Sequence, residues 1–222
     1  MADDRQSDTF YLEQFGMTDH GVLAAMGRVK VRDVDYADLY FEHTVAESIS
    51  MEESLVKRAS KSISQGVGVR ATAGEKTGYA YSDEITLKQL EQAAETARYI
   101  ARSPAGEGTI PAVRMGRPTR NLYPVALPAT DVATREKVEL LQKIDALGRA
   151  CDPRIKNVMA AFNTEYKTIL VADSDGRLVG DVQPLSRLQV TCIAEEGGQR
   201  QMGTYGGGGR GEFSFFFEEG RW

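Results

Sequence analysis

Two glycine-containing turn signals, 173–176 (DSDG) and 195–198 (EEGG), constrain the last third of the chain more than any other sequence feature. Aspartate and glycine supply the local hydrogen bonds and backbone freedom of hairpin turns. The runs around these turns carry the apolar and polar alternation of half-buried strands. We expect strands at 155–166, 168–172, 177–182, 185–194 and 199–205. Because short turns join successive strands, this region is predicted to be an antiparallel β-meander.

Three segments carry the three-and-four spacing of apolar residues that indicates amphipathic helices. The first follows an N-cap at Thr18, and the second follows Thr86, which can form a capping box with Gln89. The third covers 134–151 and ends at Asp152-Pro153. Its expected buried stripe consists of Val138, Leu141, Ile144, Leu147 and Cys151.

The stretch 66–71 (GVGVRA) matches the glycine pattern of a dinucleotide-binding turn, but such a turn must lead directly into a helix. Here the alternation continues through Tyr79 and Tyr81 after a turn at 73–77, which favours a β-hairpin. We therefore predict a strand and no nicotinamide cofactor. Gly66 and Gly68 share one face, where a backbone or a bulky side chain can approach closely. Two further strands are expected at 37–47 and 48–58.

The predicted hairpin and meander, together with the separate amphipathic helices, indicate an α+β fold with largely antiparallel sheets and packed helices. Segment 105–130 contains four prolines, together with Arg114, Arg117 and Arg120. The arginine spacing leaves an anion site open, but a solvated linker fits a proline-broken segment better. We expect a first domain at 1–104 and a second at 131–222.

A net charge of −5 with interspersed acids and bases argues against nucleic-acid binding. The sequence has no long apolar run for a membrane span and no signal-peptide pattern at its start, so a cytoplasmic protein without a membrane partner is expected. Cys151 and Cys192 lack the spacing of a paired motif and are expected to be buried, reduced thiols.

Candidate catalytic groups do not form a recognised constellation. His20 and His43 lack metal-ligand spacing, and His43 is expected to be a half-buried or surface residue of a strand. Glu52 and Glu53 are expected on opposite faces of a strand, where they cannot act as a pair. The run 206–211 (GGGGRG) lacks the ending of a phosphate loop, which leaves a flexible connector or a close-approach loop.

Four longer segments carry a resemblance to a known family: ADLYFE at 37–42, QGVGVRA at 65–71, GEKTGYAYSDE at 74–84 and TYGGGGRGEF at 204–213. They resemble the TldD branch of the TldD/PmbA family, and the resemblance extends from about Tyr11 to Glu219. It implies a zinc metallopeptidase that cleaves small or unfolded peptides, or a non-catalytic partner subunit of such an enzyme.

The resemblance also implies a zinc site built from a His-Glu-x-x-x-His helix and a distant cysteine, after the glycine-rich segment. That motif is not in this sequence, so we expect no catalytic residue, bound zinc or other cofactor in these 222 residues. We expect a scaffold that pairs with itself or with a TldD/PmbA-type subunit and forms part of a peptide-holding cavity. Its substrate-binding residues are expected to be Gly207, Gly208, Gly209 and Arg210. The alternative is a non-enzymatic module that binds an extended peptide or a partner subunit by strand addition.

Overall fold

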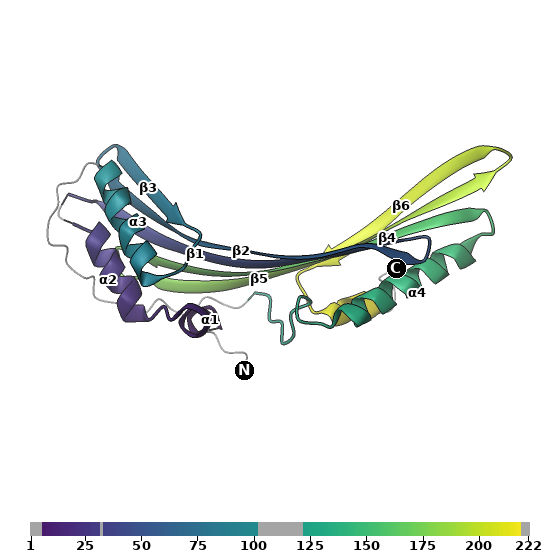
Figure 1. Ribbon diagram of the computed structural model, residues 1–222, viewed down its shortest axis with the longest axis horizontal. Coiled ribbons are helices and arrows are strands. Elements are labelled where there is room, and N and C mark those ends of the chain that lie inside the picture. The colour runs from purple at the N-terminus through teal and green to yellow at the C-terminus, as the bar shows by residue number, and fades with distance from the viewer. Residues whose placement is uncertain (1–5, 32, 102–121, 219–222) are drawn as a thin grey trace. The chain divides into compact units, whose positions relative to one another are not determined.

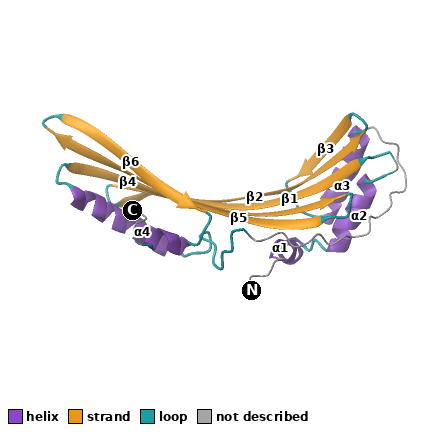
Figure 2. Cartoon of the chain, turned by 180° about the vertical axis from the view of Figure 1, so that it is seen from behind, coloured by secondary structure: helices purple, strands orange, loops and turns teal. Residues whose placement is uncertain are grey.

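The computed structural model describes residues 6–31, 33–101 and 122–218, which form one six-stranded sheet with helices packed against it (Figures 1 and 2). The strand order is β3-β2-β1-β4-β5-β6, so that each half of the chain folds as a three-stranded meander. This confirms the α+β class, the antiparallel sheet and the meander in the second half. The helices are α1 Gln6–Phe15, α2 Asp19–Val29, α3 Leu87–Ile100, α4 Thr134–Cys151 and the short 3-10 helix η1 Phe213–Phe217. The strands are β1 Tyr36–Glu52, β2 Leu55–Ala73, β3 Lys76–Ser82, β4 Ile155–Asp173, β5 Leu178–Glu196 and β6 Gln199–Gly209.

The strands are longer than the sequence patterns predict. The expected break between Glu47 and Ser48 is wrong, because the chain continues to a turn at Glu53 and Ser54. Both turn residues have positive φ, 53° and 61°, which is uncommon outside glycine. The four strands predicted between 155 and 194 are likewise two, β4 and β5. Since Glu53 lies in this turn, its expected place on a strand beside Glu52 is also wrong.

The chain divides into two compact units, and β1, β2, β4 and β5 contribute residues to both. Unit 1 contains 1–44, 64–122 and 167–182, and unit 2 contains 45–63, 123–166 and 183–222. Residues 102–121 lie outside the described ranges, and with them the three linker arginines. The sequential domains at 1–104 and 131–222 stay a prediction.

In unit 1, helices α1, α2 and α3 pack against the sheet around a shared apolar core (Figure 2). Thr18 and Thr86 cap α2 and α3 as predicted, but only half of the expected capping box forms. The backbone N–H of Gln89 donates to Thr86 Oγ1 over 3.2 Å, whereas the Gln89 side chain donates to Glu84. The stretch 66–71 lies in β2 and pairs with β3 through a turn between Ala73 and Lys76, which confirms the hairpin.

In unit 2, α4 and η1 cover a second apolar core. Phe213 and Phe216 meet Phe162 of β4 edge to face, with ring centroids 5.4 and 5.2 Å apart. The buried side of α4 consists of Lys137, Leu140, Leu141, Ile144 and Asp145. The predicted stripe is therefore wrong at its C-terminal end, where Leu147 and Cys151 are exposed. The last turns of α4 contact the sheet through Gly148, next to Val158 of β4 and Cys192 of β5.

Candidate functional site

The glycine run lies at the edge of the sheet. Residues Gly206–Gly209 are the last four of strand β6, so the expected connector or loop is wrong in its conformation. Each of these glycines has a register partner in β5, from Gly206 opposite Gln189 to Gly209 opposite Ser186. The whole stretch 199–208 is exposed, and β6 is an edge strand with a neighbouring strand on one side only.

The glycines of this run serve two different steric purposes. A Cβ at Gly206 or Gly208 would lie 2.7 Å from the Leu188 carbonyl oxygen or 2.1 Å from that of Ser186. Both distances are below van der Waals contact, so the close backbone approach expected for this run is present. A Cβ at Gly207 would meet nothing within 4 Å. Gly207 is therefore not required by the packing, and its missing side chain leaves free space.

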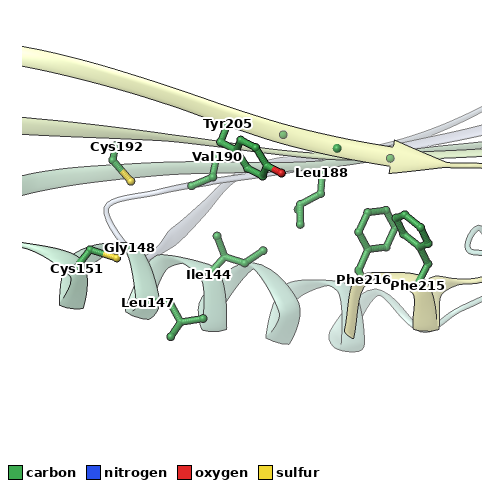
Figure 3. A pocket seen from close by; sticks show the side chains of 13 residues that line it. Ile144, Leu147, Gly148, Cys151, Leu188, Val190, Cys192, Tyr205, Phe215 and Phe216 are labelled. Carbon is green, nitrogen blue, oxygen red and sulfur yellow. The ribbon is translucent and has the colours of Figure 1, made fainter. Parts of the chain in front are cut away.

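That free space belongs to an apolar pocket of about 660 Å³ in unit 2 (Figure 3). Helix α4 forms one wall, β5 and β6 form another, and η1 closes one end. Helix α4 contributes Ile144, Leu147, Gly148 and Cys151, and η1 contributes Phe215 and Phe216. Strand β5 contributes Leu188, Val190 and Cys192, and β6 contributes Tyr205, Gly206, Gly207 and Gly208. Among the residues that the structure describes, no charged side chain lines this pocket, which suits it to an apolar group.

Of the four predicted substrate-binding residues, Gly207 and Gly208 line this pocket, whereas Gly209 and Arg210 do not. Gly209 faces the ring of Phe215, which lies 3.7 Å from its Cβ position. The Arg210 guanidinium lies 5.1 Å from the centroid of the Tyr123 ring and donates to the Pro184 carbonyl over 3.3 Å. Arg210 therefore fixes the chain just after β6.

The two cysteines differ from their expectation as buried, separate thiols. Cys151 is exposed at the end of α4, Cys192 is half-buried on β5, and both line the same pocket. Sequence spacing could not reveal this arrangement, because 40 residues and two turns of the fold separate the two positions. Burial raises the pKa of the Cys192 thiol, and Cys151 and Asp145 raise it further.

His43 lies on β1 in unit 1, where it is 9 % exposed and contacts Phe10 and Phe15 of α1. The sequence predicts a half-buried or surface position on a strand, whereas the structure has His43 at a buried strand position. Burial lowers the pKa of its imidazole, because the charged form would lose its hydration. His20, by contrast, is an exposed residue of α2.

The two histidines lie on separate elements, His20 on α2 and His43 on β1. In the ranges that the structure describes, no three His, Cys, Asp or Glu side chains come together as a metal site. Glu52 accepts a hydrogen bond from Asn157, and Glu53 forms an ion pair with Lys57 over 2.8 Å, so the two carboxylates have separate partners. In the part of the chain that the structure describes, the histidines and cysteines therefore do not come together as the two-histidine and cysteine zinc site that the resemblance implies.

Comparison with known proteins places the chain in a family of metallopeptidases. Residues 37–101 match the model of the PmbA/TldA metallopeptidase domain 1, and residues 127–221 match that of the PmbA/TldA metallopeptidase central domain. The two matches together cover more than half of the chain. The chain therefore belongs to the PmbA/TldD metallopeptidase family, as the sequence motifs predict.

Within this family the chain is similar to proteins of the TldD type. It is 40% identical over 188 residues to the metalloprotease TldD homologue of Haemophilus influenzae, covering 84% of this chain and 39% of the relative. It is 33% identical over 203 residues to the TldD homologue of Buchnera aphidicola subsp. Acyrthosiphon pisum, covering 91% of this chain and 42% of the relative. The chain thus spans about two fifths of the length of the curated relatives that it matches.

Solved structures agree with the fold. TldE from Thermococcus kodakarensis matches with a TM-score of 0.64 at 16% identity, over 85% of this chain and 43% of that one. A protein described as a putative modulator of a DNA gyrase, from Thermotoga maritima, matches with a TM-score of 0.64 at 15% identity, over 79% and 40%. At this identity the matches establish the shared fold alone.

Proposed function

We propose that this chain is the scaffold and peptide-holding part of a TldD-type zinc metallopeptidase that cleaves small or unfolded peptides. The observation that carries this proposal is the exposed glycine-rich strand β6 above an apolar pocket. The zinc chemistry belongs, in this proposal, to a His-Glu-x-x-x-His helix, a motif that residues 1–222 do not contain. No step of the reaction is assigned to residues of this chain.

The exposed edge of β6 can pair with the backbone of an extended peptide. Backbone N–H and C=O groups on the outer side of an edge strand are free to pair with an added strand, whatever the sequence of that strand. Gly206–Gly209 carry no side chains that would hold a peptide away from this backbone. An apolar side chain of the peptide would enter the pocket beside Gly207, where a Cβ meets nothing within 4 Å.

The second candidate function is a non-enzymatic module that binds a peptide or a partner subunit by strand addition. It is favoured by the other edge of unit 2, where residues 55–63 of β2 are exposed. Arg58 and Lys61 on this segment would favour a partner strand with acidic side chains. Cleavage by the whole protein distinguishes the two candidates, since only the first requires it.

Pairing with a second TldD/PmbA-type subunit, or with a second copy of this chain, is part of the proposal, as is a cytoplasmic location. None of the helices in the described part of the chain is long and apolar enough to cross a membrane. Exposed apolar residues of unit 1, among them Tyr79, Tyr81 and Tyr99, support an interface with another chain.

The test is the binding of a fluorescent, unstructured peptide with aromatic side chains, followed by fluorescence anisotropy. Gly207→Val places an isopropyl group at the pocket wall, so it is expected to raise Kd by about tenfold through lost apolar contact with the peptide. Gly203→Val is the matched control, because Gly203 is also open, faces the same side of β6 and does not line the pocket. Equal effects of both variants, or no binding by the unaltered chain, would contradict the proposal.

A further inference from the structure

Two thiols lie at one end of the pocket in unit 2, although nothing in the proposed function requires them. Cys151 is the last residue of α4, and Cys192 lies in β5 on the side that faces this helix. Figure 3 shows the two side chains entering the same end of the pocket, one from the helix and one from the strand. Both cysteines are free.

Gly148 brings the strand thiol close to the helix. A Cβ at Gly148 would lie only 3.3 Å from the Cys192 sulfur, so this sulfur rests on the backbone of the last turns of α4. Residues three apart share one face of a helix, and side chains lean toward the helix N-terminus. The Cys151 side chain therefore leans toward the Gly148 turn, where the Cys192 sulfur lies. Cys151 is also one of the groups that raise the pKa of the Cys192 thiol, which agrees with this proximity.

The position of Cys151 also permits the movement that bond formation needs. A disulfide requires Cα atoms within about 4.4–6.8 Å and specific torsion angles. Cys151 is the terminal helical residue, and Asp152 after it already has an extended backbone, with φ of −157° and ψ of 133°. Because helix ends fray, the last residue can shift without disturbing the packed part of α4 around Leu141 and Ile144.

The two thiols are suited to different steps. Cys151 is exposed and accessible to a dissolved oxidant, whereas Cys192 is half-buried. Burial raises the pKa of Cys192, so its thiol remains protonated at neutral pH and reacts slowly with an oxidant by itself. An accessible first thiol and a neighbouring second thiol are the usual parts of a redox-active pair.

We propose that Cys151 and Cys192 form a redox-active pair that closes to an intramolecular disulfide when hydrogen peroxide oxidises Cys151. The Cys151 sulfur attacks one peroxide oxygen, the O–O bond breaks, and the other oxygen leaves as water, which gives a sulfenic acid. The Cys192 sulfur then attacks the Cys151 sulfur, the S–O bond breaks, and the hydroxyl group leaves as water with the Cys192 proton. Two thiols and one peroxide become one disulfide and two waters, and a dithiol reductant reverses the change.

The disulfide fastens the end of α4 to β5 across one end of the pocket. Leu147 and Gly148, which line the pocket beside Cys151, then lose their freedom to move away from the sheet. The pocket is therefore held at a fixed width in the oxidised form and is free to widen in the reduced form.

The experiment treats the full chain with hydrogen peroxide at low protein concentration and maps thiols by non-reducing peptide mass spectrometry. We expect a cross-linked peptide containing Cys151 and Cys192 in a chain that remains monomeric on a denaturing non-reducing gel. Cys192→Ser should stop at a sulfenic acid on Cys151 that dimedone traps. In Cys151→Ser, peroxide should oxidise Cys192 at least about tenfold more slowly than it oxidises Cys151 in the unaltered chain, because the remaining thiol is shielded and protonated. Cys192 should therefore stay reduced while Cys151 of the unaltered chain reacts.

A second measurement does not depend on the folding of any variant. Phenylarsine oxide bridges only thiols that lie close together, so the unaltered chain should bind one equivalent and then resist peroxide. The proposal is overturned if peroxide gives only disulfides between chains, or sulfinic acid on Cys151 beside an unreacted Cys192. Failure of the arsenical to bind would overturn it as well.

Discussion

At the scale of single residues, the most demanding feature is a buried ion pair. Lys137 of α4 is fully buried, and its ammonium contacts the Glu47 carboxylate of β1, which is 9 % exposed. Taking both charges out of water is costly, and only their mutual attraction offsets that cost. Since both residues lie in unit 2, the pair fixes the register of α4 on the strands beneath it.

Removing one charge is therefore expected to be far worse than removing both. Lys137→Met should lower the free energy of unfolding by about 3–5 kcal/mol, because Glu47 would remain buried without a partner. The double variant with Glu47→Leu should recover most of this loss. Urea unfolding of the two single variants and the double variant measures the coupling, and a double variant as unstable as Lys137→Met would contradict this account.

His43 predicts a dependence of stability on pH. Its pKa in the folded chain is lowered by burial, so the unfolded chain binds the proton first as the pH falls. The free energy of unfolding should then decrease as the pH drops below about 6.5, and continue to decrease until the folded-state pKa is reached.

His43→Leu should remove this pH-dependent part, whereas His20→Asn at the exposed position on α2 should retain it. Unfolding midpoints measured between about pH 5.5 and 7.5 test the point, because this range spans the ordinary histidine pKa. If the acid destabilisation of both variants equals that of the unaltered chain, other groups are responsible for it.

At the scale of elements, the approach of α3 to β3 depends on Gly78, which no sequence pattern distinguishes. A Cβ at Gly78 would lie 1.9 Å from the Ala97 carbonyl oxygen, so helix and strand are in contact through their backbones. At Gly68, which the sequence marks as a position of close approach, a Cβ would instead meet the Tyr79 side chain at 2.5 Å. That side chain is 57% exposed and can turn away.

Gly78→Ala is therefore expected to lower the free energy of unfolding by about 1–3 kcal/mol through overpacking. Gly68→Ala, the control in the neighbouring strand, should change it by less than about 0.5 kcal/mol, because a surface side chain can yield. Chemical denaturation compares the two. A Gly78→Ala chain as stable as the Gly68→Ala chain would mean that α3 moves away from the sheet at little cost.

Local signals decide which elements could be predicted. Thr86 marks the start of α3, the 134–151 pattern gives the bounds of α4, and the turns at 173–176 and 195–198 place the hairpins of the meander. The turn at Glu53 and Ser54 has no glycine, asparagine or proline, so its position could not be predicted from composition. Polar residues inside β4 and β5 also resembled breaks, although the sheet continues through them.

The candidate site could be predicted only in part. The sequence shows the glycine run as a distinct feature, but which of its glycines are sterically required depends on the backbone of β5 beside them. The pocket combines α4, β5, β6 and η1, and nothing local in the sequence brings Cys151 to the pocket of Cys192 or Phe215 to that of Leu188. These contacts arise from tertiary packing, which periodicity does not record.

At the scale of the whole molecule, the composition leads to a prediction about activity. Peptide hydrolysis by the family's route needs a metal that lowers the pKa of water to about 7, held by three ligands with one open position. We expect residues 1–222 alone to hold no stoichiometric zinc and to cleave no peptide, because their only histidines, His20 and His43, lie on separate elements. Zinc content by mass spectrometry and cleavage of an unstructured peptide test this, and one tightly held zinc with turnover would contradict it.

The order of the strands also bears on how the chain folds. Neighbouring strands within β1-β2-β3 and within β4-β5-β6 are close in sequence. The pairing of β1 with β4, by contrast, brings together residues that are far apart in sequence, such as Ser48 and Asn163, which are 115 positions apart. Closing so long a loop costs entropy before any contact compensates for it. The two hairpin arrays should therefore form early and separately, and the seam between β1 and β4 should form last. Until it does, two inner strands present unpaired edges, and it is during this interval that the chain is most exposed to aggregation.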